Sequence, residues 1–495
     1  MALSQGREAT APPGRASSLR RNYLSGLENV AQAVGTMGPT ATLGTTIPLL
    51  IGKSGNGSWL LFIAVLVVFI LITHSITVFA KDHVSAGSIG AYTELGLGRL
   101  PGVVAGWSYL IAMLFVVISS AVSSAYYVTL TIAHFTGHPL GMMASIALTT
   151  SIVALAWWPS YHDIKLSTKL MLAIEAVSVA MIVFILGTAL IKTGHWIDRP
   201  QLRLEGVDVS HVRLGFVLAF MLLAGFESVT TLGEEACAAT TTIPRVMLTC
   251  LVPIGILFLV STYGLTALSH YRNLALDQTD APFDLVAQSI GLPSLGWISS
   301  VGVALSCFGC ALGGFNAGGR VVYSMARTGK FWARFGEVHP RNATPYRALA
   351  FLGIVALVVP AVMLRLGIAM NDAMDYLMQI ASFGFIGSYS ALCLSAPVYL
   401  ARKGVLTPVT IGISVVTLTA IAGALFLTLY PVPDAPWRYL PIVFAGLLGL
   451  GVALTVWGRG RAGSLARRPA PPETGDSVLP TAGTPGDRYP TRPPA

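Results

Sequence analysis

Long apolar stretches, nearly free of Asp, Glu, Lys and Arg, recur along almost the whole chain. A helix that crosses a membrane needs about 20 mostly apolar residues, whereas a strand of a membrane barrel alternates in polarity and needs only about 10. The lengths therefore predict membrane-spanning helices, two of which tolerate one carboxylate each, Glu175 and Glu227. The twelve predicted spans are residues 29–52, 57–80, 101–135, 139–161, 170–191, 214–233, 246–269, 294–319, 348–364, 376–401, 404–433 and 439–458.

The polar regions at both ends divide the chain into three parts. We expect residues 1–24 to form a basic arm, residues 25–460 a transmembrane transporter domain, and residues 461–495 a tail rich in Pro, Gly and Thr. The tail cannot bury enough apolar area to fold, so we expect it to be disordered. Twelve spans put both termini on one side, and Lys and Arg concentrate on that side, as they do in cytoplasmic loops. Both termini are therefore expected in the cytoplasm.

Composition agrees with a membrane protein and excludes other classes. Apolar residues make up 54% of the 495 residues and charged residues 11%, whereas soluble domains carry about 25% charged residues. A soluble enzyme and a disordered chain are both excluded. The net charge is +9, and the charged residues lie between the apolar stretches. They therefore indicate the membrane topology and no nucleic-acid partner. We expect a multi-pass protein of the cell membrane, surrounded by the lipid bilayer.

Two predicted helices carry residues that interrupt a helix near their centre. The first span reads Val34-Gly35-Thr36-Met37-Gly38-Pro39-Thr40-Ala41-Thr42, and proline donates no backbone hydrogen bond and disfavours helix at the preceding residue. The sixth span places Gly225 two residues before the intramembrane Glu227. Freed backbone groups at this depth are tolerated only inside the protein or along a cavity. Breaks at corresponding positions of two halves are typical of a transporter site.

The two breaks also predict which ligand chemistry they suit. The half-helix after Pro39 has its positive end at mid-membrane and suits a carboxylate, whereas the half-helices that end near Met37 and Ala224 offer carbonyls to an ammonium group. An anion site beside a cation site fits a zwitterion, so we expect an amino acid substrate. Glu227 has two interpretations that stay open: it marks the pathway, or it satisfies backbone N–H groups freed by the break.

Three longer stretches carry a resemblance to a known family. Their residues are Ser85-Ala86-Gly87-Ser88, Tyr92, Gly98, Gly102, Gly106 and Trp107; then Gly225-Phe226-Glu227, Glu234-Glu235-Ala236 and Ile243-Pro244-Arg245; then Arg320, Tyr323, Met325-Ala326-Arg327, Gly329, His339-Pro340 and Thr344-Pro345. Together they resemble the amino acid permeases of the amino acid–polyamine–organocation superfamily over roughly residues 20–460. The resemblance implies an all-α fold with a five-plus-five inverted repeat of the leucine-transporter type and two extra C-terminal helices.

The resemblance also implies a substrate site built from both breaks. Thr40 and the N–H of Ala41 would hold the carboxylate, and carbonyl groups at the ends of the half-helices would hold the ammonium group. With Gly38 at the first break, these substrate-binding residues are Met37, Gly38, Thr40, Ala41, Met221 and Ala224.

Selection among amino acids must come from the walls of the pocket, since both of these sites consist largely of backbone. Relatives often carry an aromatic gate at the position of Met221; Phe220 is the nearest aromatic residue here, and Tyr127 is the expected contact from the third span. Apart from Glu227 the expected walls carry no charge, so an additional buried carboxylate would lack a partner. Neutral amino acids are the expected substrates, and cationic ones or amines are the alternative if Glu227 faces the cavity.

Candidates for ion coupling lie in the fifth and sixth spans. Proton-coupled relatives often hold a lysine midway along the fifth span; Ser178 occupies that position here, with Glu175 one turn earlier. The carboxyl groups of Glu175 and Glu227 favour H+ as the coupling ion, whereas Ser178 would belong to a Na+ site. Both ions stay open.

These observations predict a secondary active transporter that works by alternating access. The alternatives are a polyamine or other amine transporter or exchanger of the same fold, and a non-transporting amino acid sensor. An intramembrane enzyme needs paired catalytic groups, but Glu175, Glu227 and His74 are widely separated along the chain. ATP hydrolysis is not expected, because the chain lacks the motif G-x-x-x-x-G-K-[ST]. We expect no catalytic residues, no cofactor and no metal ion.

Overall fold

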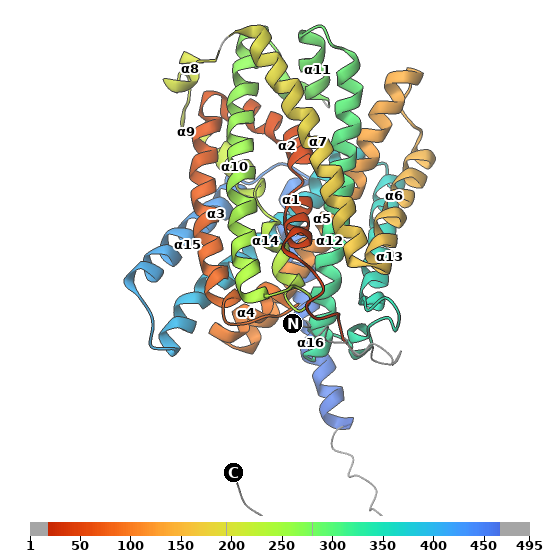
Figure 1. The fold of residues 1–495 in the computed structure, drawn as a ribbon, viewed down its shortest axis with the longest axis vertical. Coiled ribbons are helices and arrows are strands. Elements are labelled where there is room, and N and C mark those ends of the chain that lie inside the picture. The colour runs from red at the N-terminus through yellow and green to blue at the C-terminus, as the bar shows by residue number, and fades with distance from the viewer. Residues whose placement is uncertain (1–17, 195, 280, 466–495) are drawn as a thin grey trace, which may run out of the picture.

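The computed structural model describes residues 18–194, 196–279 and 281–465. This part of the chain is helical and holds no strand, only an isolated bridge between Leu24 and Ala236. The long helices run side by side as a bundle, with α4 and the end of α16 at one end and α8 and α11 at the other (Figure 1). Most of the expected arm and tail, residues 1–17 and 466–495, lies outside the described residues.

Sixteen α-helices and five short 3-10 helices follow one another along the described chain. The α-helices are α1 Gly26–Met37, α2 Pro39–Ser54, α3 Ser58–Ala80, α4 Ser88–Leu97, α5 Arg99–Thr136, α6 Met142–His162, α7 Ile164–Thr193, α8 Arg199–Leu202, α9 Val209–Met221, α10 Ala239–Arg272, α11 Pro282–Ser289, α12 Ser294–Arg327, α13 Tyr346–Arg365, α14 Met370–Arg402, α15 Pro408–Leu429 and α16 Leu440–Leu465. The 3-10 helices are η1 Gly55–Gly57, η2 Phe226–Leu232, η3 Leu276–Gln278, η4 Ala333–Gly336 and η5 Trp437–Tyr439.

Eleven helical segments of the described chain are long and apolar enough to cross a membrane. We predicted twelve, and the difference lies at the start of the chain. There α1, α2, η1 and α3 follow one another as a single segment, Gly26–Ala80, which covers the predicted spans 29–52 and 57–80. Twelve crossings and the inverted repeat therefore stay predictions. At the other end, α16 runs to Leu465, so residues 461–465 are helical where we expected the start of a disordered tail.

Helix α5 forms the centre of the bundle, with α12 and α14 packed along it. In the most apolar stretch of α5, 89% of the residues are buried, against 17% in the segment Trp437–Trp457. Glycines allow the close contacts: a Cβ at Gly314 of α12 would lie 2.6 Å from a methyl of Val117, and one at Gly384 of α14 would lie 2.6 Å from the Ser108 carbonyl oxygen. Small residues bring membrane helices together in this way.

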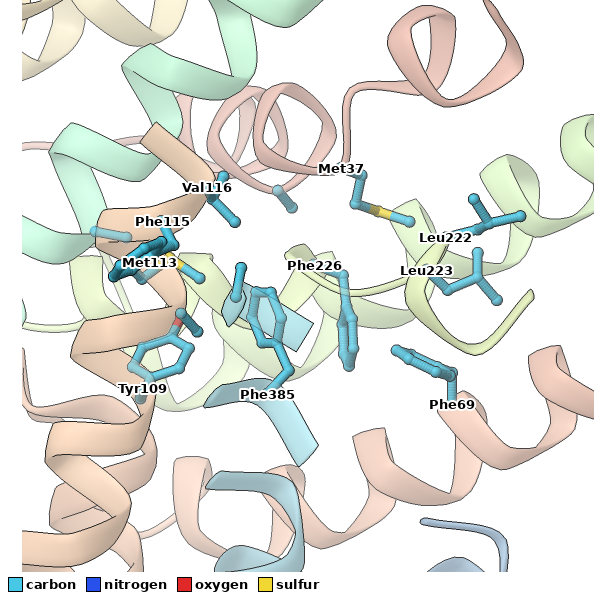
Figure 2. Packing of buried hydrophobic residues seen from close by; sticks show 14 of the residues in the cluster. Met37, Phe69, Tyr109, Met113, Phe115, Val116, Leu222, Leu223, Phe226 and Phe385 are labelled. Carbon is cyan, nitrogen blue, oxygen red and sulfur yellow. The ribbon is translucent and has the colours of Figure 1, made fainter. Parts of the chain in front are cut away.

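Aromatic side chains pack beneath the second helix break. The ring of Phe226 lies between those of Phe385 and Phe69 (Figure 2), and its centroid is 6.0 Å from that of Phe69. On the other side of the break, Phe220 lies edge-on to Phe69 at 5.2 Å. These contacts anchor the chain on both sides of the break against α3.

Two residues of the motif set form a buried ion pair. Arg320 of α12 is fully buried and donates from Nε and Nη2 to the two carboxylate oxygens of Glu235, while its Nη1 donates to the Asn316 carbonyl oxygen at 3.0 Å. A two-pronged contact of this kind fixes orientation as well as distance. The pair holds the loop after η2 against α12.

The segment before α1 is bound to the same loop. The N–H groups of Tyr23 and Leu24 both donate to the Glu235 carbonyl oxygen, at 2.8 and 2.9 Å, and the Cys237 N–H donates to the Leu24 carbonyl oxygen at 2.8 Å. The start of α1 is thereby attached to the chain that follows η2.

Candidate functional site

The first predicted break is present at the expected residues. Helix α1 ends at Met37, α2 begins at Pro39, and Gly38 between them has φ 53° and ψ 65°. Glycine adopts this left-handed conformation without the steric cost that a side chain brings, and proline is favoured at the first position of the new helix. The Gly-Pro pair thus ends one helix and starts the next within a single residue.

The second predicted break is also present. Helix α9 ends at Met221, and the chain continues without α-helix to η2, with Gly225 at φ 105°. A Cβ at Gly225 would lie 3.0 Å from the Thr36 carbonyl oxygen, so the backbones of the two breaks are in direct contact. The Ser228 hydroxyl donates to Thr36 Oγ1 at 3.0 Å and joins them again.

A cavity of about 120 Å³ lies between the two breaks. Helices α1, α2, α5, α9, α12 and α14 contribute to it. Its lining residues are Thr36, Met37, Ala41, Thr42, Thr45, Thr46, Val116, Ser120, Ser123, Met221, Leu222, Ala224, Gly225, Cys307, Cys310, Met378 and Phe385. None of these described lining residues carries a charged side chain.

The substrate residues expected from the sequence divide into two groups. Met37, Ala41, Met221 and Ala224 line the cavity. The rest are not among its lining residues: Gly38, Thr40, Tyr127, Phe220 and Glu227.

Two of these five residues make contacts with other parts of the protein than the cavity. The Tyr127 hydroxyl donates to the Gly44 carbonyl oxygen at 3.1 Å, so its ring supports α2. Phe220 is fully buried against Phe69. The side chain that accompanies Met221 at the cavity is Phe385 of α14, which sequence position alone did not indicate.

Glu227 satisfies a backbone donor at the second break. Its Oε2 accepts the Gly225 N–H at 3.0 Å and the Tyr389 hydroxyl at 2.7 Å, and the side chain is fully buried. Of the two open interpretations, this geometry agrees with a carboxyl group that satisfies freed N–H groups.

A chain of hydrogen bonds links the first break to Glu175 of α7. The Ala41 N–H donates to Ser306 Oγ at 2.9 Å, and the Ser306 hydroxyl donates to Glu175 Oε1 at 2.6 Å. The amide that we expected to bind the substrate carboxylate is therefore held by Ser306 of α12.

Three buried oxygens near this chain have no hydrogen-bond partner among the described residues: Thr40 Oγ1, Glu175 Oε2 and Ser178 Oγ. Buried polar groups are normally paired, so unpaired ones around a helix break agree with a place where a ligand or an ion is bound for part of a cycle. Glu175 and Ser178 are three residues apart on α7 and share one face of that helix.

Comparison with known proteins places these features in a family. A family model for amino acid permeases matches residues 29–457. The chain belongs to the amino acid permease family. The permease is 24% identical over 391 residues to the branched-chain amino acid permease BcaP of Bacillus subtilis, which covers 74% of this chain and 79% of that protein.

Two other relatives carry different names. The methylthioribose transporter of Bacillus subtilis is 23% identical over 382 residues, 72% of this chain and 77% of that protein. The human Asc-type amino acid transporter 1 is 24% identical over 280 residues, 54% of this chain and 51% of that protein. The permease is thus a multi-pass membrane protein of a transporter family.

Sequence reasoning missed several cavity residues of this permease. Ser120 and Ser123 line the cavity from α5, and Cys307 and Cys310 line it from α12. Both pairs have a spacing of three, which places each pair on one helix face. The spacing was visible in the sequence, but the direction of the face was not.

Proposed function

We propose that this permease moves small neutral amino acids across the cell membrane by alternating access. The observation that carries the proposal is the uncharged cavity at which two broken helices meet. Broken helices present unpaired N–H and C=O groups without the cost of burying a charge, and a zwitterion needs both kinds of group.

The binding mode follows from the polarity of the half-helices. In the proposal, the substrate carboxylate lies at the start of α2, near Thr40 and the Ala41 N–H, and the ammonium group lies near the carbonyls of Met37, Met221 and Ala224. The unpaired Thr40 hydroxyl supplies a further donor. Ser306 now accepts from Ala41, so in this mode the carboxylate takes the place of Ser306 on that amide.

The lining supports neutral substrates over charged ones. Glu227 does not line the cavity, so an additional ammonium group on a cationic amino acid or polyamine has no carboxylate to meet, and the second carboxylate of glutamate has no cation. An unpaired buried charge is strongly unfavourable. The cavity is small, about 120 Å³, which favours small substrates.

We propose H+ as the coupling ion, taken up at Glu175. Its Oε1 is one hydroxyl away from the Ala41 amide through Ser306, so adding or removing a proton at this carboxyl group changes the Ser306 bond that competes with the substrate. The thiols of Cys307 and Cys310 on α12 lie near enough to interact electrostatically with this carboxyl group. The alternative coupling ion is Na+, bound near Ser178.

Counterflow in liposomes tests transport directly. Purified permease is reconstituted with unlabelled alanine inside, and uptake of labelled alanine is followed against competitors that include leucine, glutamate, putrescine and methylthioribose. We expect counterflow, with competition by neutral amino acids and not by glutamate or putrescine. Binding without counterflow would instead identify a sensor, and preferential competition by glutamate would contradict the assignment of the walls.

Coupling is tested in the same liposomes. Uptake driven by a pH gradient should collapse with a proton uncoupler and should not change when Na+ is replaced by K+. Glu175→Gln should abolish gradient-driven uptake while counterflow, which needs no driving ion gradient, persists. A strict Na+ requirement at fixed pH would contradict the proton assignment.

A further inference from the structure

A second cavity lies apart from the substrate site, where α2 ends and α9 begins. Its volume is about 440 Å³. Helices α2, α9, α14 and α15 and the chain between α15 and α16 surround it. Its lining residues are Lys53, Arg213, Leu218, Gln379, Phe383, Leu427, Thr428, Pro431, Val432, Pro433, Asp434, Trp437 and Pro441.

Two cations line this cavity, and neither forms an ion pair with a described residue. The Arg213 Nε is buried and has no hydrogen-bond partner among the described residues, and the ion pairs found in the described chain include neither Arg213 nor Lys53. Asp434 lines the same cavity but pairs with neither cation. A buried, unpaired guanidinium nitrogen is costly, and an anion that accepted from it would remove that cost.

The remaining wall is mostly apolar and continues into the membrane-facing surface of α15. Leu218, Phe383 and Leu427 line the inner part. In the apolar stretch of α15, only 28% of the residues are buried, and Phe426 beside Leu427 is 59% exposed. Trp437 also lines the cavity, and tryptophan is enriched where a membrane meets water. The cavity therefore combines two cationic side chains with an apolar wall that lies next to the exposed surface of α15.

We propose that this cavity binds an anionic phospholipid, with the phosphate at Arg213 and Lys53 and an acyl chain along Leu218, Phe383 and Leu427. Guanidinium groups bind phosphate oxygens through two parallel hydrogen bonds. A small phosphorylated molecule without an acyl chain would leave the apolar wall of the cavity without a contact. The proposed ligand touches α9, which leads into the second break. It is distinct from the substrate, and the inference does not depend on which substrate the permease moves.

Lipid binding to the purified permease tests the proposal without any transport measurement. Native mass spectrometry compares retention of phosphatidylglycerol with retention of phosphatidylcholine. The perturbing variant is Lys53→Gln with Arg213→Gln, and the matched control is Arg272→Gln, an exposed arginine that lines none of the cavities described above. We expect a preference for phosphatidylglycerol in the wild type and the control, and loss of that preference by about tenfold in the double variant, as expected for charged hydrogen bonds.

Two further measurements separate a phospholipid from a small anion. Leu427→Trp fills part of the apolar wall and keeps both cations, so it should weaken phosphatidylglycerol binding and leave binding of inorganic phosphate unchanged. If the double variant does not fold, Arg213→Lys keeps the charge without the planar fork and should show a partial loss. Unchanged phosphatidylglycerol binding in the charge variants would overturn the proposal. So would inorganic phosphate binding as tight as that of the lipid with no effect of Leu427→Trp.

Discussion

Gly38→Ala tests whether the cavity depends on the geometry of the first break. A side chain at the left-handed φ of 53° costs about 1–2 kcal/mol. The new Cβ would also lie 2.1 Å from Cys310 Sγ, which must then move within a packed wall, and overpacking of this kind costs about 1–3 kcal/mol. Together these terms destabilise the present conformation by about 2–5 kcal/mol. If substrate binds this conformation, affinity falls about 30-fold or more, at about 1.4 kcal/mol per tenfold.

The Cys310→Ala variant makes this prediction specific. It removes the sulfur that the new Cβ meets but leaves the backbone strain, so Gly38→Ala with Cys310→Ala should regain at least about fivefold in affinity over Gly38→Ala alone. Equilibrium binding of labelled amino acid to the wild type, both single variants and the double variant completes the cycle. Wild-type affinity in Gly38→Ala, or strictly additive effects in the double variant, would refute the reasoning, since residues in contact are expected to couple.

Three other predictions concern single features of the site and its surroundings. Thr40→Val removes a hydroxyl that has no hydrogen-bond partner in the part of the chain that the structure describes, so thermal stability should hold while substrate affinity falls about tenfold; an unchanged dissociation constant would remove Thr40 from the site. A small methanethiosulfonate should block uptake through Cys307 and Cys310, substrate should slow the block, and a Cys307→Ser, Cys310→Ser variant should resist it; equal block in that variant would exclude these thiols. Outside the membrane, the backbone N–H of His211 donates to Asp208 and holds the pKa of that carboxyl group below its usual range. This cap of α9 is therefore complete above the ordinary carboxyl pKa of about 4 and is lost as pH falls through the lowered value. Asp208→Ala should accelerate amide exchange at the start of α9 at pH 7, and no change there would contradict the cap.

The breaks were predictable because their signals are local. A Gly-Pro pair and a glycine two residues before a buried glutamate restrict the backbone whatever lies around them, and Gly38 and Gly225 both adopt conformations that favour glycine. The spans were predictable for the same reason, since length and polarity alone define them. Only the first pair of spans differed, because η1 follows α2 directly and leads into α3.

The walls were harder to predict, since an apolar membrane helix does not show from its sequence which face meets the cavity. Tyr127 and Phe220 lie on helices that contribute to the cavity, yet both point to other neighbours. The partner of Glu175 is Ser306, which is 131 residues away in sequence. Contacts of this range depend on how whole helices are placed, and no pattern within one helix specifies them.

The attachment of residues 23–24 to residues 235–237 has a mechanical consequence. Helix α1 has 12 residues and is therefore about 18 Å long at 1.5 Å per residue. If it moves as a rigid body, it rotates about Gly38, which follows its last residue. Its far end is fastened by three backbone hydrogen bonds to the chain after η2, and Arg320 fastens that chain to α12. Rotation at Gly38 must therefore carry η2 along or break those three bonds. If the permease works by the alternating access proposed above, opening towards this end of the bundle should therefore displace α1 and η2 together.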